Sequence, residues 1–369
     1  MDSPSKTLLI ITDSLSSADG KGRFSQGLIK EFKRFYELIA LAALAEKTEG
    51  IKIIKIPDLF HSRNILDVIK YSFLNLKYSK RANFIHFFTD IPYYLIFSPV
   101  IWFKIKPYFI TVHGTYGIAP LNSKWKKFLL RKIYQRAEKV ICISNFTQRQ
   151  LLKRIALNNT TTIHNGVDFE RFARQKFIKK EKTKNIILSV GVVKVRKGYH
   201  ISIPAVIEAK KFFPNLKYYI IGKISDKVYF NKLKKIIKNS HLEDDIVFLG
   251  EVPGDKLIDF YYQADLFLLT PVINRDSFEG FGLVYLEANT CGKPVIGTYD
   301  CGAEEAIKDG YTGLLVPQND ILKTSEAIVK LLSNPTLVQN LGENGRKRAK
   351  DMEWQRAAGQ YLKIYNHLF

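Results

Sequence analysis

The sequence lacks the cysteine pattern of a disulfide framework or a metal site. Its three cysteines, Cys142, Cys291 and Cys301, show neither metal-ligand nor redox-motif spacing. An odd number of them suggests reduced thiols, which predicts a cytoplasmic compartment. No uninterrupted apolar run approaches the roughly 20 residues that a transmembrane helix needs. Because the short apolar run Leu8–Ile11 is cut off by Asp13, we expect a first strand there rather than a signal peptide.

Acidic residues are scarce in the first half of the chain. Residues 1–180 contain 31 Lys and Arg against 13 Asp and Glu, whereas the remaining residues contain 26 against 22. Aromatic residues lie among these cations in the segments Lys70–Arg81, Tyr93–Phe97, Trp102–Lys106 and Lys124–Phe128. Such a composition suits an anionic membrane surface, where about 1 kcal/mol per cation is available, and it would also suit nucleic acid. A solvated basic surface with its aromatics in the core is the third interpretation. No nucleic-acid partner is expected, because no helix-turn-helix, zinc-finger or RNA-binding motif is present.

Apolar, β-rich runs alternate with amphipathic stretches along the whole chain, without internal repeats or low-complexity segments. This alternation predicts parallel sheets with crossover helices. The first series of predicted strands covers 6–12, 51–56, 84–88, 109–112, 140–143 and 161–163, and the second covers 185–190, 217–221, 246–249, 266–269, 294–297 and 313–316. A charged connector, Arg171–Lys184, separates the series, and 369 residues can bury two cores. We therefore predict two Rossmann-like α/β domains, at 1–170 and 171–350, followed by a C-terminal helix at 351–369.

The segment Ser277–Thr298 has the most informative pattern in the sequence. Glu279 lies in a loop after a predicted strand, and Glu287 lies about one and a half turns into the next helix. Open α/β sheets bind ligands at the carboxyl ends of their strands. Gly280 and Gly282 would let a diphosphate approach the backbone, and the helix start favours an anion. Because two carboxylates would repel phosphates, we expect them to accept hydrogen bonds from sugar hydroxyls, which predicts a nucleotide-sugar site.

This segment resembles the Glu-x7-Glu signature of the retaining glycosyltransferases of family 4. Weaker landmarks in the right order extend the resemblance over nearly the whole chain. The resemblance implies the GT-B fold, in which two Rossmann-like domains face each other across a cleft and the C-terminal helix crosses back to the first domain. It also implies that Glu279 contacts the donor sugar, that Glu287 contacts the ribose, and that Gly282 and Leu283 bind the donor at the helix start.

The segment Ser189–Gly198 is similar to the family's phosphate-binding landmark. Lys197 matches a lysine that pairs with the donor diphosphate, and an ammonium group is a suitable point charge for a departing nucleotide. The family usually has an arginine directly after the first glycine, where this chain has Val192. We hypothesise that Arg196 or Arg275 supplies the missing cation, although Arg275 could equally be a solvated loop charge.

Three further positions are predicted to meet the substrates. A glycine-rich loop after the first strand can bring backbone N–H groups against a phosphate. Lys21 separates Gly20 from Gly22 in this loop, where the family commonly has adjacent glycines, and we assign the donor contact to Gly22. A lone histidine is more often structural, but the resemblance implies that His113 contacts the donor sugar or positions the acceptor hydroxyl. Gly250 belongs to the strand end whose backbone holds the nucleotide base in the family.

The resemblance implies a hexose transfer from a nucleotide diphosphate sugar, with UDP as the expected nucleotide. The expected acceptor is a hydroxyl of a glycan or lipid-linked molecule in surface polysaccharide synthesis. The resemblance also implies retention of the anomeric configuration without a metal or other cofactor. With the basic first half, it predicts a cytoplasmic enzyme at the inner face of the membrane. Two other functions stay open: a starch- or sucrose-type transferase with a soluble acceptor, and a catalytically degenerate GT-B protein, at which Val192 hints.

Overall fold

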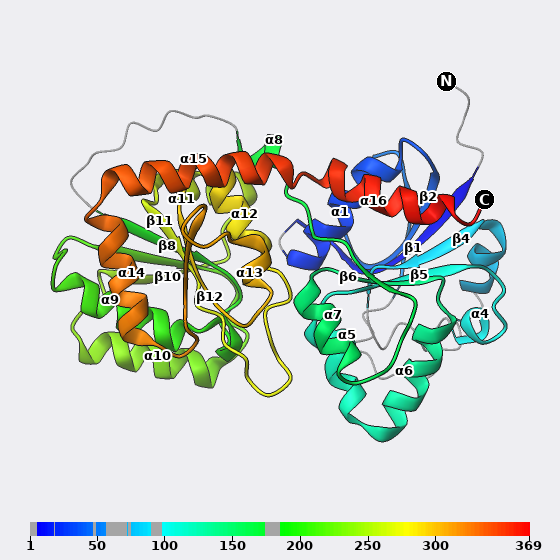
Figure 1. Cartoon of the computed structure of the whole chain (residues 1–369), viewed down its shortest axis with the longest axis horizontal. Helices are drawn as coiled ribbons and strands as arrows, with labels where there is room; N and C mark the ends of the chain where they lie inside the picture. The colour runs from blue at the N-terminus through cyan, green and yellow to red at the C-terminus, as the bar shows by residue number, and fades with distance from the viewer. Residues whose placement is uncertain are drawn as a thin grey trace. The chain divides into compact units, whose positions relative to one another are not determined.

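The structure is a computed structural model that describes residues 6–17, 19–46, 49–56, 72, 75–89, 98–173 and 185–369. Its contacts divide the chain into two compact units (Figure 1). The first unit comprises Met1–Gly166 and Trp354–Phe369, and the second comprises Val167–Glu353. The predicted divisions, after residues 170 and 350, lie within a few residues of these. The basic and aromatic segment Tyr93–Phe97 and most of the connector Arg171–Lys184 lie outside the described residues.

The first unit is built, in its described residues, on a seven-stranded parallel sheet with the order β3-β2-β1-β4-β5-β6-β7. The strands are β1 Thr7–Leu15, β2 Glu37–Ala45, β3 Lys52–Lys55, β4 Phe84–Phe87, β5 Tyr108–Val112, β6 Lys139–Cys142 and β7 Thr160–Thr162. The helices are α1 Gly20–Phe32, α4 Ser98–Trp102, α5 Thr115–Ile118, the 3₁₀ helix η1 Ala119–Asn122, α6 Lys124–Arg136, α7 Asn145–Leu152 and α16 Trp354–Asn366. Strands β4 and β5 are buried at every residue, as expected of a parallel sheet covered on both faces.

Strand β2 is absent from the predicted set, whereas the six strands predicted for this half are confirmed with their ends shifted by at most three residues. The sequence of β2 is rich in Leu and Ala, which favour helix. Its apolar run is continuous, and periodicity alone does not separate such a strand from a buried helix. Parallel pairing with β1 on one side and β3 on the other decides its conformation.

The C-terminal helix α16 packs against α1 in the first unit (Figure 1). Gly27 of α1 lies so close to Trp354 that a Cβ atom on Gly27 would stand 2.3 Å from the indole ring. Phe24 meets the same indole edge-on, with ring centroids 5.7 Å apart. Further along α16, Tyr361 and Tyr365 are buried. These contacts make the last helix part of the core of the first unit.

A buried polar network also joins α16 to the sheet. His86 on β4 is hydrogen-bonded through Nδ1 to the Tyr365 hydroxyl and through Nε2 to Thr111 Oγ1, the latter at 2.9 Å. The Tyr361 hydroxyl lies 3.4 Å from the same Thr111 oxygen. Burial, with a contribution from His113, lowers the pKa of His86 well below its ordinary value, so the imidazole is neutral at physiological pH.

We expect the first unit to lose stability on acidification because of His86. The folded state binds this proton more weakly than the unfolded state does. The contribution of His86 is therefore fully present above about pH 6.5 and is lost as the pH falls toward the folded pKa. Thermal unfolding followed by circular dichroism from about pH 8 to about pH 5 checks this. His86→Gln should flatten the pH dependence, and an equal slope in both proteins would contradict the assignment.

The second unit is built, in its described residues, on a six-stranded parallel sheet with the order β10-β9-β8-β11-β12-β13. The strands are β8 Ile186–Val190, β9 Lys217–Ile221, β10 Ile246–Gly250, β11 Leu266–Leu268, β12 Val295–Thr298 and β13 Gly313–Val316. The helices are α8 Phe169–Phe172, the 3₁₀ helix η2 Val195–Lys197, α9 Tyr199–Lys210, α10 Lys227–Asn239, α11 Gly254–Gln263, α12 Leu283–Thr290, α13 Ala303–Ala306, α14 Ile321–Leu332 and α15 Pro335–Asp351. All six strands predicted for this half are confirmed, with ends shifted by no more than one residue.

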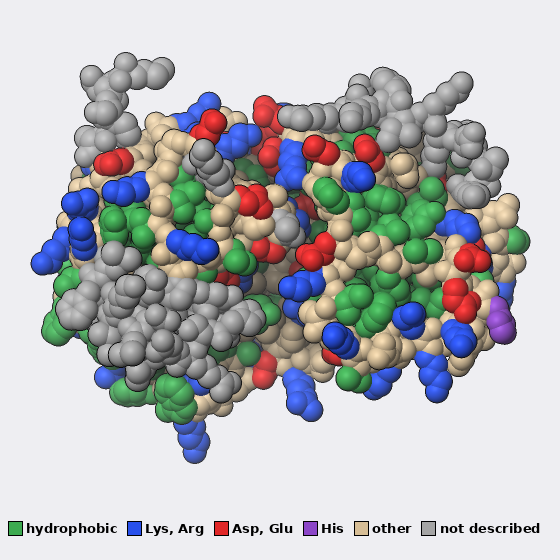
Figure 2. All heavy atoms as spheres, turned by 180° about the vertical axis from the view of Figure 1, so that it is seen from behind, with side chains coloured by type: hydrophobic (Ala, Val, Ile, Leu, Met, Phe, Trp, Pro, Cys, Tyr) green, Lys and Arg blue, Asp and Glu red, His purple; other side chains and the backbone are tan. Residues whose placement is uncertain are grey.

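The formal charge of +22 is not gathered into one block on the face shown in Figure 2. Lys and Arg side chains are interspersed there with Asp and Glu over both green and tan areas. On this face, the total charge by itself therefore marks no interaction surface.

Candidate functional site

The strand order reverses at one place in each sheet, between β1 and β4 in the first unit and between β8 and β11 in the second. Loops that leave two such strands diverge to opposite faces, and the crevice at their carboxyl ends is where open α/β sheets bind ligands. In the second unit, Arg196 and Lys197 follow β8 and Glu279 follows β11. Arg196 and Lys197 are 83 and 82 positions away from Glu279 in the chain, and the fold brings all three residues to one switch point.

The carboxylate of Glu279 binds two cations, and we call Arg196, Lys197 and Glu279 the ion cluster. Oε2 of Glu279 accepts hydrogen bonds from Nη1 of Arg196 at 2.6 Å and from Nζ of Lys197 at 2.7 Å. Glu279 and Lys197 are buried, and the Arg196 side chain is mostly so. Two cations against one carboxylate leave one net positive charge, which suits an anionic ligand.

The ion cluster controls the ionisation of Glu279. Burial by itself raises the pKa of this carboxyl, because desolvation disfavours the charged form. Lys197 and Arg196 outweigh burial and lower the pKa to about 2. Glu279 therefore stays ionised at neutral pH and cannot donate a proton there. An oxygen that two cations already hold is also a poor nucleophile, so the arrangement favours electrostatic contact and acceptance of hydrogen bonds.

Close backbone approaches hold the loops that carry the ion cluster. The carbonyl of Glu279 accepts from the N–H of Gly302 at 2.9 Å, and a Cβ atom on Gly302 would stand 2.1 Å from the Gly280 carbonyl oxygen. Gly198, directly after the two cations, has a φ of +73°, and a Cβ atom there would stand 1.6 Å from the carbonyl oxygen of Thr270. Glycine is required at both positions, and the loops after β8, β11 and β12 are thereby held against one another.

The second predicted carboxylate, Glu287, lies on α12 and is 2% exposed. Its Oε2 accepts a hydrogen bond of 2.9 Å from the hydroxyl of Tyr261 on α11. The helix begins at Leu283, as predicted, after Gly282 with a φ of +90°. Tyr261 is absent from the predicted site residues, because an apolar-periodic tyrosine in an amphipathic helix gives the same sequence signal as any core residue.

Two other residues that are predicted to bind the donor, Gly250 and Arg275, have a positive φ. Gly250 ends β10 with a φ of +69°, and its carbonyl accepts from the N–H of Gly222 at 2.8 Å. Arg275 is exposed, with a φ of +54°, in a tight turn whose flanking residues, Asn274 and Ser277, exchange two backbone hydrogen bonds of 2.9 Å. Within the described part of the chain, Arg275 forms no hydrogen bond or ion pair with Glu279. The arginine that the structure brings to the carboxylate is Arg196.

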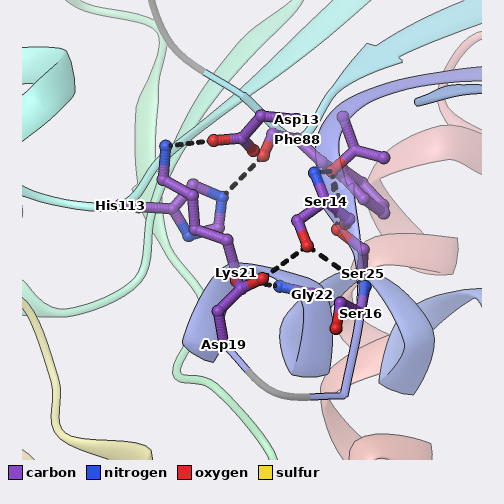
Figure 3. A network of polar contacts seen from close by, with 10 residues as sticks. Asp13, Ser14, Ser16, Asp19, Lys21, Gly22, Ser25, Phe88 and His113 are labelled. Carbon is purple, nitrogen blue, oxygen red and sulfur yellow. Dashed lines mark hydrogen bonds and ion pairs between the residues drawn. The ribbon is translucent and has the colours of Figure 1, made fainter. Parts of the chain in front are cut away.

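In the first unit, strand β1, helix α1 and the loops after β4 and β5 bring a second set of side chains together (Figure 3). Lys21 forms an ion pair of 2.9 Å with Asp13, and Nε2 of His113 donates to the carbonyl oxygen of Phe88 at 3.0 Å. The ring of Phe24 packs edge-on against His113 at 4.5 Å. Since a carbonyl oxygen only accepts, Nε2 of His113 carries the hydrogen, and the ring orientation is fixed from two sides.

The structure gives Gly22 a packing role. A Cβ atom on Gly22 would stand 1.9 Å from the Ser16 carbonyl oxygen, so the loop needs glycine there. The N–H of Gly22 donates to the side chain of Asp19 at 2.8 Å, which caps α1. The Asp19 carboxylate thus takes the acceptor position that the sequence analysis assigns to a phosphate. A donor contact at Gly22 requires this bond to open and stays a prediction.

The three cysteines are free and buried. Burial raises the pKa of each thiol to about 12, so all three are protonated and unreactive at neutral pH. Within the described ranges, no three His, Cys, Asp or Glu side chains are grouped as a metal ion would need. In that same part of the chain, none of the helices combines the length and the apolar character needed to cross a bilayer.

Comparison with known proteins gives matches over most of the chain. The family model "Glycosyl transferases group 1" matches residues 170–348, and "Glycosyltransferase Family 4" matches residues 29–171. An uncharacterised glycosyltransferase of Methanocaldococcus jannaschii is 31% identical over 264 residues, which are 71% of this chain and 69% of that protein. A GDP-mannose-dependent α-(1-6)-phosphatidylinositol monomannoside mannosyltransferase of Mycolicibacterium smegmatis is 28% identical over 241 residues, 61% of either chain.

A solved structure shares the fold over almost its full length. The crystal structure of Anabaena Alr3699/HepE in complex with UDP and glucose superposes with a TM-score of 0.80, at 17% identity, over 98% of this chain and 99% of that one. At this identity the likeness establishes the fold. Together with the two parallel sheets, it confirms the predicted pair of Rossmann-like domains of the GT-B type.

Proposed function

The chain belongs to the group 1 glycosyltransferases, and we propose that it transfers a hexose from a UDP-sugar, with retention of configuration, to a glycan or lipid-linked acceptor in surface polysaccharide synthesis. The ion cluster carries this proposal. Its net positive charge lies at the switch point, where a departing diphosphate gains charge, and Glu279 is ionised and able to accept hydrogen bonds from sugar hydroxyls. UDP is the nucleotide bound with glucose in the Anabaena neighbour, whereas the mannosyltransferase of Mycolicibacterium smegmatis is named for GDP-mannose, so we propose UDP and test it directly against GDP.

In the proposed reaction, the bond between the anomeric carbon and the β-phosphate oxygen breaks. The acceptor oxygen bonds to the same carbon from the same face, and its proton passes to the departing phosphate, so the products are UDP and a glycoside of unchanged configuration. Lys197 and Arg196 stabilise the charge that develops on the diphosphate. Glu279 holds the sugar rather than attacking it, and His113 orients the donor sugar or the acceptor hydroxyl.

Calorimetric titration of the purified protein with UDP, GDP and ADP, without added metal, tests the donor assignment. Tight binding of UDP alone is the expected result. A preference for GDP or ADP would retain the family and overturn the choice of donor. If none of the three bound, the degenerate GT-B protein would become the better interpretation, and Val192 would be the residue to replace by arginine.

The same titration separates the two candidate cations. Arg196→Ala should weaken UDP binding by about tenfold, because a charged hydrogen bond contributes about 1.5 kcal/mol or more. Arg275→Ala should leave the affinity unchanged, since Arg275 is an exposed turn residue. An equal loss in both variants would show that the turn takes part in binding.

We also propose that the enzyme works at an anionic membrane surface through helix α6 of the first unit. This helix carries six basic and no acidic residues: Lys124, Lys126, Lys127, Arg131, Lys132 and Arg136. Three large aromatic side chains on α6 and beside α4 are exposed, namely Phe103 (80%), Trp125 (65%) and Phe128 (62%). Lys132 lies over the rings of both Trp102 and Phe128, which places cations among these aromatics.

The sequence of α6 is unfavourable for a helix that only faces water. Three lysines in its first turn oppose the helix dipole, and Ser123 at the N-cap makes no side-chain capping bond. Exposed Trp and Phe flanked by Lys are typical of a helix that lies in the membrane interface. Anionic headgroups would offset the charge repulsion while the aromatics enter the acyl boundary.

Sedimentation with lipid vesicles tests the membrane proposal. Binding is expected to vesicles that contain phosphatidylglycerol, to weaken with salt, and to fall by about tenfold or more in the variant Trp125→Ser/Phe128→Ser. Phe212→Ser is the matched control, because Phe212 is equally exposed but lies in the second unit. Unchanged binding of the double variant, or binding to RNA in place of vesicles, would overturn the assignment.

A further inference from the structure

Glu287 and Glu279 are held in chemically different ways. Glu279 accepts hydrogen bonds from two cations, whereas Glu287 accepts a hydrogen bond of 2.9 Å from the neutral phenol of Tyr261. A carboxylate has about four acceptor positions, and the phenol takes one of them. A carboxylate that accepts from a phenol can therefore also accept hydrogen bonds from the hydroxyl groups of a ligand.

The position of the Tyr261 hydroxyl is set by the packing of its ring. Tyr261 is fully buried on α11. Its ring is stacked on Phe267 of β11 at 5.9 Å with an interplanar angle of 29°, and it meets Phe172 of α8 edge-on at 5.8 Å. Because α8 and β11 hold the ring on two sides, the position of the Tyr261 hydroxyl is fixed. It therefore restricts the rotation of the Glu287 side chain from outside α12.

From this geometry we infer that Tyr261 is a positioning residue that aims the carboxylate of Glu287 at the ribose hydroxyls of the donor nucleotide. The inference rests on the proposed function and extends it, since it adds a residue to the part of the site that reads the ribose. Tyr261 acts through Glu287 and is not placed in contact with the nucleotide. Removing its hydroxyl should affect recognition of the ribose 2′- and 3′-hydroxyls and leave the rest of the nucleotide's binding in place.

The chain offers a matched control in the next residue. Tyr262 is partly buried on the same helix, and its hydroxyl donates a hydrogen bond of the same 2.9 Å length, but to the backbone carbonyl of Phe172. Tyr262→Phe therefore removes the same atom from the same helix without touching Glu287. Tyr261→Phe keeps the ring and its two aromatic contacts, so the core loses one oxygen atom and no packing.

The test compares the affinities of UDP and 2′-deoxy-UDP by calorimetry in five proteins: wild type, Tyr261→Phe, Tyr262→Phe, Glu287→Gln and Tyr261→Phe/Glu287→Gln. The wild type and Tyr262→Phe should prefer UDP by about tenfold or more, and Tyr261→Phe should reduce this preference by about fivefold. In the double variant, Tyr261→Phe should add nothing to the effect of Glu287→Gln. With a UDP-sugar, Tyr261→Phe should raise KM and leave kcat close to that of the wild type.

The outcomes separate the failure of this inference from that of the proposed function. If Tyr261→Phe weakens UDP and 2′-deoxy-UDP equally, its hydroxyl is a structural group and the inference is wrong, while UDP binding still stands. An unchanged preference in Tyr261→Phe would likewise overturn the inference. If the wild type binds neither nucleotide, the proposed function fails and this inference fails with it. Thermal unfolding of each variant, with and without UDP, shows that the comparison is made on folded protein.

Discussion

Glu279→Gln is expected to lower kcat by about 100- to 1,000-fold and to leave the affinity for UDP unchanged or higher. The amide loses the charged contact with the donor sugar, which lowers the rate. It also removes the one negative charge of the ion cluster, so the net charge beside the diphosphate rises from one to two positive units. Turnover should therefore fall without a loss of nucleotide affinity, and steady-state kinetics with calorimetry on one preparation measures both.

The control for Glu279→Gln is Glu326→Gln. Glu326 on α14 also accepts a 2.7 Å hydrogen bond from a lysine, Lys323, but both side chains are exposed. Exposed pairs of this kind contribute little, so this variant should behave as the wild type. Removing one partner of a buried ion pair can cost about 3–5 kcal/mol, so thermal unfolding must accompany the kinetics. A Glu279→Gln enzyme with full turnover would refute the assignment.

Trp354→Ala is expected to destabilise the first unit by about 3–5 kcal/mol. The indole is buried where α16 meets α1, in contact with Phe24 and directly over Gly27, whose missing side chain makes room for it. The substitution leaves a cavity that the surrounding rings cannot fill without moving. Urea unfolding followed by circular dichroism should show an earlier transition for the first unit, with the transition of the second unit unchanged.

Trp125→Ala is the matched control for Trp354→Ala. Trp125 is 65% exposed on α6 of the same unit, and its removal should change the unfolding free energy by less than about 0.5 kcal/mol. If the two tryptophan variants unfolded at the same urea concentration, α16 would not contribute to the core of the first unit in the way its contacts indicate. The comparison does not depend on activity, so it tests the structure alone.

The success and the failure of the strand predictions have the same physical origin. The predicted strands are short apolar runs bounded by turn residues, and a run such as Tyr218–Ile221 has few other ways to bury its side chains. Strand β2 has the same continuous apolar character but consists largely of helix-forming Leu and Ala. It is a strand because it pairs with β1 on one side and β3 on the other, and both partners come from elsewhere in the chain.

In the candidate site, too, some residues can be predicted from a local sequence pattern and others cannot. Glu279 and Glu287 are recognisable because glycines, a helix start and a following strand surround them within about twenty residues of sequence. Nothing local distinguishes Arg196 from Arg275 as the partner of Glu279, or Tyr261 from its neighbour Tyr262 as the partner of Glu287. The structure makes both choices, through the hydrogen bonds of Arg196 and of Tyr261.

The amino-acid sequence by itself therefore determined the fold class and the positions of most strands, and it singled out the two carboxylates of the candidate site, because each of these is encoded in a short stretch of chain. Only the tertiary structure decided that Arg196 and Lys197 share Glu279, that Tyr261 holds Glu287 and that Asp19 caps the helix at Gly22. The first two choices depend on the order of strands β8 and β11 in the sheet and on the packing of α11 against its neighbours. The third depends on how tightly the loop folds back on Ser16. Such distances are set by the whole fold and by no local pattern.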